Sequence, residues 1–191
     1  MLAQLHAVLD RQALDQNVSI HERQAPLRTR YDADPAKAWV TDSAKTSSVE
    51  IPAARPLYTH VTFGVGLPAD QFIGVHKAVG GKSDFPCPGD IFAAAIASCL
   101  DSSTRMIANI LGLRLERLEV SVKARADVRG ALRMEGSVPV GFQHVDVSVC
   151  MKGAPGVTDD QLEMLLNAAE QSCVLLQTLK SPPSIQMSLN K

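Results

Sequence analysis

Residues 88–111 read PGDIFAAAIASCLDSSTRMIANIL, and this stretch carries the clearest signal of the fold. The segment is apolar almost all round, a pattern typical of a helix that is buried on most of its sides. Pro88 suits the first position of a helix, and Asp90 suits the positive end of the helix dipole. Gly112 is a natural C-terminal stop. The stretch therefore predicts one long helix at the centre of the molecule.

Two strands are predicted directly after this helix. Apolar residues alternate with period two from Leu118 to Val128 and again from Val145 to Met151, which is typical of half-buried strands. Residues 129–141 contain Gly, Pro and charges, so they are expected to form a hairpin connection.

A second helix and a last strand complete the C-terminal half. Thr158 and Gln161 match a capping box, which predicts a helix start. Ser181-Pro182-Pro183 ends this helix, and the alternation of Ile185, Met187 and Leu189 predicts a final strand. The predicted helix carries one apolar stripe: Leu162, Leu165, Leu166, Ala169 and Cys173.

The region before residue 88 is organised differently. Residues 1–24 predict an amphipathic helix that Pro26 breaks, so we expect a helical extension over 1–24 and a domain over 25–191. Residues 57–65 and 72–77 alternate as strands, and residues 42–56 indicate a long loop or a frayed edge. Arg28 and Arg30 lie on one face of a predicted first strand. The order of elements predicts an α+β fold with an antiparallel sheet.

Composition excludes several classes of partner. Lys and Arg number 19 and Asp and Glu number 20, so no basic excess is available for nucleic acid or an anionic membrane. No apolar run approaches the roughly 20 residues of a membrane helix, and the N-terminus does not resemble a secretory signal. We therefore expect a cytoplasmic protein with neither nucleic acid nor membrane as partner.

The four cysteines are the candidates for chemistry: Cys87, Cys99, Cys150 and Cys173. Each is by default a small buried hydrophobe, and Cys87 suits a tight turn between two prolines. No Cys-x-x-Cys and no zinc spacing occurs, so no metal is expected. Cys99 and Cys173 lie on apolar stripes of the two predicted helices, and two such thiols could cycle with a disulfide if the helices pack together.

The two cysteine segments resemble the OsmC/Ohr family of thiol-dependent organic hydroperoxide reductases. In that family a Pro-initiated, Ala-rich helix carries the peroxidatic cysteine in an Ala-x-Cys setting, which here is Ala97-Ser98-Cys99. The family's second cysteine stands near the end of the second helix, where this chain has Cys173, with Val174 in place of the usual Pro. The resemblance extends from about Phe72 to the C-terminus.

The resemblance implies a fold and a reaction. The fold would be OsmC-like, with antiparallel sheets and two central helices in an intertwined homodimer. Cys99 would attack an organic hydroperoxide and become a sulfenic acid, and Cys173 would close a disulfide that a dithiol, such as a lipoylated protein, reduces. No cofactor is implied. The apolar wall of Phe92, Ile96 and Met106 favours an alkyl or lipid substrate.

The activation of Cys99 is the point where this chain departs from the family. Related proteins use an Arg held by a Glu at the start of the helix, and that Glu position is Gly89 here. Asp90, one residue on, is interpreted first as a carboxylate at the helix dipole. Candidate cations are Arg28, Arg30, His76 and Lys77, each of which would otherwise be a solvated residue of a strand. The alternative function is an OsmC-like binding or redox-sensing module with weak or no peroxidase activity.

Overall fold

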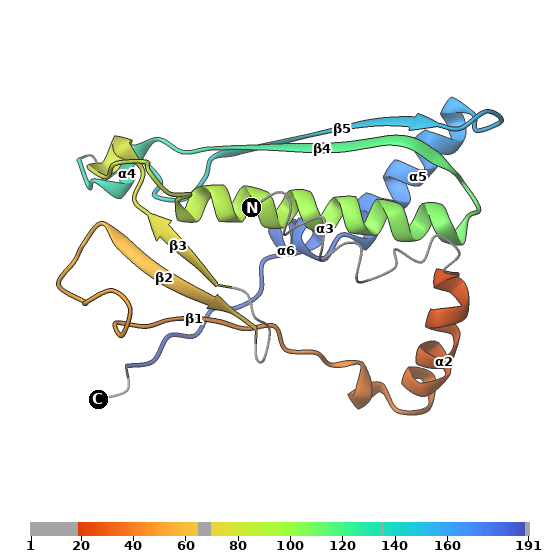
Figure 1. The fold of residues 1–191 in the computed structure, drawn as a ribbon, viewed down its shortest axis with the longest axis horizontal. Helices are drawn as coiled ribbons and strands as arrows, with labels where there is room; N and C mark the ends of the chain where they lie inside the picture. The colour runs from red at the N-terminus through yellow and green to blue at the C-terminus, as the bar shows by residue number, and fades with distance from the viewer. Residues whose placement is uncertain (1–18, 65–69, 135, 190–191) are drawn as a thin grey trace, which may run out of the picture.

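The structure is a computed structural model that describes residues 19–64, 70–134 and 136–189. It is an α+β fold with two antiparallel sheets, of order β1-β2-β3 and β4-β5, as expected from the order of elements (Figure 1). The elements are α2 (Ile20–Ala33), η1 (Pro35–Ala38), β1 (Ala44–Thr46), β2 (Tyr58–Phe63), β3 (Asp70–Gly74), η2 (Lys77–Val79), α3 (Pro88–Ile110), β4 (Leu115–Arg125), α4 (Val128–Ala131), β5 (His144–Gly153), α5 (Asp159–Ser172) and α6 (Val174–Lys180).

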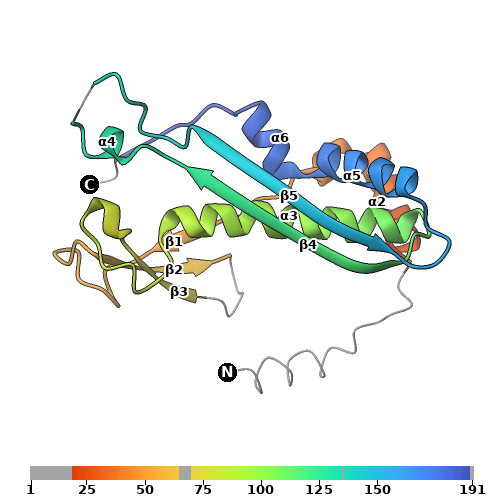
Figure 2. The ribbon, with the colours of Figure 1, turned by 90° about the horizontal axis from the view of Figure 1, so that it is seen from above.

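The β4–β5 hairpin covers one side of the central helix α3. The two strands pair from Leu115↔Gly153 to Arg125↔His144, and half-buried and exposed side chains alternate along both, apart from the irregularity between Leu115 and Arg117. Seen from above, the hairpin crosses α3, and α5 and α6 lie beside α3 (Figure 2). The two predicted strands are confirmed. β4 ends at Arg125, short of Val128, because Asp127 caps the short helix α4.

The long helix predicted over residues 88–111 is confirmed as α3. Cys87 is its N-cap, Pro88 takes the first position, and the Asp90 carboxylate accepts the Cys87 backbone N–H at 2.8 Å. Gly112, with φ +67°, follows the helix end in the left-handed conformation that favours glycine.

Burial of α3 is one-sided within the single chain. The helix packs against β4, α5 and α6, yet Met106 and Ile110 are 40% and 37% exposed. The expectation of burial on most sides is therefore wrong for one chain, because one hairpin and two helices cover only part of the surface. Among the described helices α3 alone is long and apolar enough to span a membrane, contrary to the sequence-based expectation, but it lies where the core helix of this fold packs.

The second predicted helix divides at Cys173. Its capping box is confirmed, since the Gln161 N–H donates to Thr158 Oγ1 at 3.3 Å and the Thr158 N–H donates to Gln161 Oε1 at 3.0 Å. The continuous helix expected up to Ser181 is wrong: Cys173 has an extended backbone (φ −77°, ψ 104°) and separates α5 from α6.

The capping box provides a test of this helix start. Thr158→Ala removes the hydroxyl that accepts the Gln161 N–H, so we expect the free energy of unfolding to fall by about 1 kcal/mol. Urea denaturation followed by circular dichroism measures the change. Thr158→Ser keeps the hydroxyl and should recover most of the loss. An unchanged denaturation midpoint for Thr158→Ala would show that the cap does not stabilise α5.

The N-terminal region corrects three expectations. β2 and β3 confirm two predicted strands and β1 pairs at the edge, but β3 ends at Gly74, so His76 and Lys77 begin η2 instead of extending a strand. Arg28 and Arg30 lie on α2 and not on a first strand, and Pro26 lies inside that helix without ending it. Proline removes one backbone donor, and the Ser19 cap starts the helix upstream.

The predicted extension and the last strand have different outcomes. Residues 1–18 lie outside the described residues, and the expected boundary between residues 24 and 25 falls inside α2. Residues 181–189 form no strand; Ile185 is 86% and Met187 95% exposed, and the segment extends away from α6 without joining a sheet (Figure 1). Alternation alone does not make a strand, because backbone N–H and C=O groups need a neighbouring strand to pair with.

Candidate functional site

Cys99 and Cys173 meet where α3 packs against the corner between α5 and α6. Cys173 is fully buried in one cluster with Leu100 and Ala169, and the half-buried Cys99 packs against that cluster. Both thiols are free. The sequence-based expectation that these two cysteines come together is thus met, although they lie 74 positions apart in the chain.

The surroundings of the two thiols are apolar. The partly buried side chains that pack on the cluster come from α3, the β4–β5 hairpin and α6: Ile107, Val120, Val147, Val149, Leu175 and Leu176. Among the described residues, no charged side chain contributes to the pKa of the Cys173 thiol. The medium around the Cys173 sulfur therefore disfavours an ion and favours the neutral thiol.

Burial raises the pKa of the Cys173 thiol above its ordinary value, and the neighbouring Cys99 thiol adds to the rise. Backbone N–H groups at the start of α6, on Leu176 and Leu175, oppose it. Cys173 is therefore a neutral thiol near neutral pH, suited to the resolving rather than the attacking role.

This raised pKa predicts a pH dependence of stability. The folded state favours the protonated Cys173 thiol. The stabilisation that this thiol contributes is therefore complete below the usual thiol pKa of about 8.5, and it is lost as the pH rises through the higher pKa of the folded state. We expect the free energy of unfolding of the reduced protein to fall as the pH rises above about 8.5. The fall should be smaller in Cys173→Ala. Urea denaturation at several pH values tests this, and equal slopes for both proteins would contradict it.

Phe92, Ile96 and Met106, which were predicted to form one apolar wall, lie in three different environments. Phe92 stacks on Phe142, with ring centroids 5.0 Å apart and an interplanar angle of 17°. Ile96 is 1% exposed in the core, whereas Met106 is open on the uncovered side of α3. Ile96 and Phe92 therefore serve packing within the chain, and Met106 is available to a ligand or a second subunit.

The start of α3 explains what replaces the family's Glu. A Cβ atom on Gly89 would lie 3.2 Å from Phe142 Cζ and 3.5 Å from Cys87 Sγ, so the aromatic ring covers the place where a longer side chain would extend. The N–H and thiol of Cys87 lower the pKa of Asp90, with a smaller effect from His76. Asp90 is the third residue of α3, and its carboxylate completes the capping box with the N-cap Cys87.

The four candidate cations lie on elements outside the cysteine cluster. His76 lies near Asp90, and its Nδ1 accepts the Ala78 N–H at 3.1 Å. Lys77 belongs to η2, and Arg28 on α2 donates to Gln24 at 3.0 Å. Arg30 is in the last turn of α2. Among the described residues, none of these four side chains contributes to the pKa of the Cys173 thiol.

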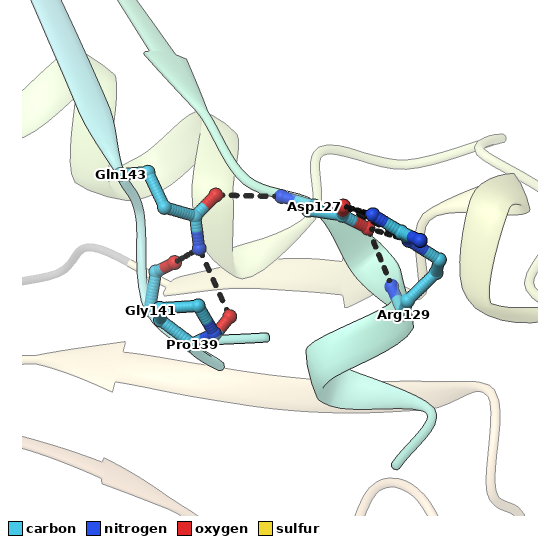
Figure 3. A network of polar contacts seen from close by, with 5 residues as sticks. All are labelled: Asp127, Arg129, Pro139, Gly141 and Gln143. Atoms are coloured by element: carbon cyan, nitrogen blue, oxygen red, sulfur yellow. Dashed lines mark hydrogen bonds and ion pairs between the residues drawn. The ribbon is translucent and has the colours of Figure 1, made fainter. Parts of the chain in front are cut away.

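A cavity of about 600 Å³ opens at the start of α3, on a different part of the helix from Cys99. Its walls are mostly apolar, with His76, Asp90, Lys123 and the Cys87 thiol as polar groups. One wall is the segment between β4 and β5, which Gln143 fastens: its amide accepts the Asp127 N–H at 2.7 Å and donates to the carbonyl groups of Pro139 and Gly141 (Figure 3).

Sequence reasoning missed Phe142 and Cys87 as lining residues, since both lie in irregular segments where periodicity carries no signal. It also missed Leu175 and Leu176, which the break at Cys173 directs onto the cluster. The described residues contain no group of three side chains placed to hold a metal ion.

Comparison with known proteins identifies the family to which this chain belongs. Residues 81–188, more than half of the chain, match the sequence profile of the family described as OsmC-like protein. The chain is a member of the OsmC-like protein family. No curated protein sequence matches it.

Solved structures agree on the fold. The OsmC-like protein of Mycoplasma pneumoniae superposes with a TM-score of 0.58 at 8% identity, covering 75% of this chain and 89% of that one. An organic hydroperoxide resistance protein from Elizabethkingia anophelis gives 0.54 at 20% identity, covering 75% and 91%. The organic hydroperoxide resistance protein OsmC of Legionella pneumophila gives 0.52 at 20%, covering 74% and 90%. At these identities the likeness concerns the fold.

Proposed function

We propose that this protein is a thiol-dependent peroxidase that reduces organic hydroperoxides, alkyl or lipid, to alcohols. The observation that carries the proposal is the meeting of Cys99 and Cys173 inside the α3–α5–α6 core. Membership of the OsmC-like family supports it. So do the names of the Elizabethkingia and Legionella proteins, which are organic hydroperoxide resistance proteins. We place the reaction in the cytoplasm, where thiols stay reduced between turnovers.

The reaction has three steps. The Cys99 thiolate attacks the terminal peroxide oxygen; an S–O bond forms, the O–O bond breaks, and the alkoxide leaves as an alcohol after taking a proton. The Cys173 thiol then attacks the Cys99 sulfur, so that a disulfide forms and water leaves. A dithiol such as a lipoylated protein reduces the disulfide by exchange and is itself oxidised. This scheme uses no metal, haem or flavin.

The attack requires a cation near Cys99 that the cysteine cluster of one chain does not supply. Cys99 lies more than two turns into α3, where the helix dipole has faded, and the cluster on which it packs is apolar. We assign the activation to Arg28, Arg30, His76 or Lys77, brought to Cys99 by a second subunit. Asp90 is already engaged at the Cys87 N–H, so it does not take the role of the family's Glu.

A homodimer would cover the exposed side of α3 and would also bring a cation close to Cys99. The open side of α3 exposes Met106, Ile110 and Leu111, and the apolar residues of the 181–189 segment are more than four-fifths exposed. Exposed apolar side chains on these two segments favour burial against another chain. Sedimentation should show a dimer at micromolar concentration, and a stable monomer there would contradict this part of the proposal.

The experiment that tests the function measures stoichiometry. The reduced protein is mixed with tert-butyl or lipid hydroperoxide and a dihydrolipoyl donor, and hydroperoxide, alcohol and oxidised donor are quantified. We expect one alcohol for each donor oxidised, a Cys99–Cys173 disulfide in peptide mass spectra, and slower reaction with hydrogen peroxide. Turnover without that disulfide would overturn the two-cysteine mechanism.

The apolar shell of Cys99 favours a second candidate, a binding or redox-sensing module with weak or no peroxidase activity. The alkylation rate of Cys99 against pH separates the two. A midpoint clearly below the free thiol pKa of about 8.5, lost in one of the neutral variants at Arg28, Arg30, His76 or Lys77, supports the enzyme. A midpoint at or above that value in every protein supports the module.

A further inference from the structure

The corner between α5 and α6 is tied together by Glu170. Its backbone carbonyl accepts the Cys173 N–H at 3.3 Å and the side-chain amide of Gln177 at 2.9 Å. Its carboxylate pairs with Lys180, in the last turn of α6. Glu170 therefore holds the residue at the corner and two residues of the helix beyond it.

The amide of Gln177 compensates for the break in the helix. In a continuous helix the Glu170 carbonyl would accept the N–H of Val174, but the extended backbone of Cys173 removes that geometry. The Gln177 side chain, from the next helix, donates to the same carbonyl. A half-buried carbonyl is thus satisfied by a residue whose side chain has to lie over the corner.

α6 depends on such contacts for its position. It has only seven residues, and isolated helices of that length are unstable in water. Apart from the Glu170 contacts, Leu175 and Leu176 anchor it by packing on the Cys173 cluster. Loosening the end of α6 would therefore loosen the backbone on both sides of the Cys173 sulfur.

We propose that Glu170, together with Lys180 and Gln177, is a positioning residue that keeps the Cys173 thiol against Cys99 and so sets the rate of disulfide closure. This inference rests on the proposed peroxidase function and names residues that serve its second step. In that step Cys173–SH and Cys99–SOH give the disulfide and water. Because two groups held in reacting geometry have a high effective concentration, a loose corner slows closure without changing the attack on the peroxide.

The first test compares variants that lack one of the Glu170 contacts with a matched control. Lys180→Met removes the ion pair, Gln177→Leu removes the amide bond, and Lys180→Arg retains the charge. Lys152→Met is the control. It removes a similarly exposed lysine that pairs with Glu116 on the β4–β5 hairpin, and it changes the net charge by the same amount as Lys180→Met. Each reduced protein receives one equivalent of tert-butyl hydroperoxide, and a cyclic 1,3-dione that traps sulfenic acid is added at timed intervals for mass spectrometry.

We expect disulfide closure to slow about two- to fivefold in Lys180→Met, as for the loss of an exposed ion pair, and about fivefold in Gln177→Leu. Sulfenic acid should form at the wild-type rate in both. Lys180→Arg and Lys152→Met should close at the wild-type rate, and about 1 M salt, where the Debye length is about 3 Å, should slow wild type but not Lys180→Met. Disulfide closure at the wild-type rate in both Lys180→Met and Gln177→Leu, or equal slowing in Lys152→Met, would overturn the proposal.

A second measurement does not depend on peroxidase activity. Equilibration with mixtures of oxidised and reduced dithiothreitol gives the stability of the Cys99–Cys173 disulfide, in which two protein thiols are oxidised and the cyclic disulfide is reduced. Lys180→Met and Gln177→Leu should lower this equilibrium constant two- to fivefold, again with Lys152→Met unchanged. If wild type forms no sulfenic acid, the proposed function fails, and an unchanged equilibrium constant then rejects the positioning role separately.

Discussion

Cys99→Ser is expected to lower the rate of organic hydroperoxide reduction by about a thousandfold or more, because a serine hydroxyl at this position cannot supply the ionised nucleophile. Consumption of tert-butyl hydroperoxide with a dihydrolipoyl donor measures the loss. Cys173→Ser should retain the first attack and leave Cys99 as a sulfenic acid, since only the resolving thiol is removed. The burst of one alcohol per subunit then separates the two roles.

Cys150→Ser is the matched control for this experiment. Cys150 is exposed on β5, opposite Glu119, and does not belong to the cysteine cluster. Its replacement should leave the reduction rate unchanged. Retention of activity in Cys99→Ser would assign the chemistry to another thiol and reject the proposed mechanism.

Leu165→Ala is expected to destabilise the protein by about 2–5 kcal/mol, the range for removing a fully buried leucine. Leu165 is 0% exposed and lies on the same stripe of α5 as Ala169 and Cys173, so the cavity would form directly beside the thiol cluster. Urea denaturation at a fixed protein concentration measures the change, since an assembly would make stability depend on concentration.

Met164→Ala serves as its control because Met164 precedes Leu165 in the chain and is 51% exposed. Its effect should stay within about 0.5 kcal/mol, as for most surface substitutions. Similar losses at both positions would mean that the stripe of α5 facing α3 is not the buried one.

Much of the C-terminal half could be predicted from local patterns. The apolar run of α3, the alternation of β4 and β5 and the capping box at Thr158 are each decided by residues within a few positions of one another. The approach of Cys99 to Cys173 also followed, because a cysteine on the apolar stripe of each helix faces the packing interface between them.

The N-terminal region and the chain end were predicted less well. Arg28 and Arg30 fall in a segment with little apolar periodicity, and the cap that starts α2 lies seven residues before Pro26. The alternation of Ile185, Met187 and Leu189 is real in the sequence, but a strand requires a partner that no described segment of this chain provides.

Local sequence patterns were enough to predict the helices and strands with periodic signals and to indicate that Cys99 and Cys173 could meet. Three features of their surroundings depend on contacts between distant segments: the Phe142 ring over Gly89, the break at Cys173, and the ion pair between Glu170 and Lys180. The physical reason is that periodicity reports which face of an element is apolar, whereas ring contacts, helix breaks and ion pairs depend on segments brought together by the fold of the whole chain.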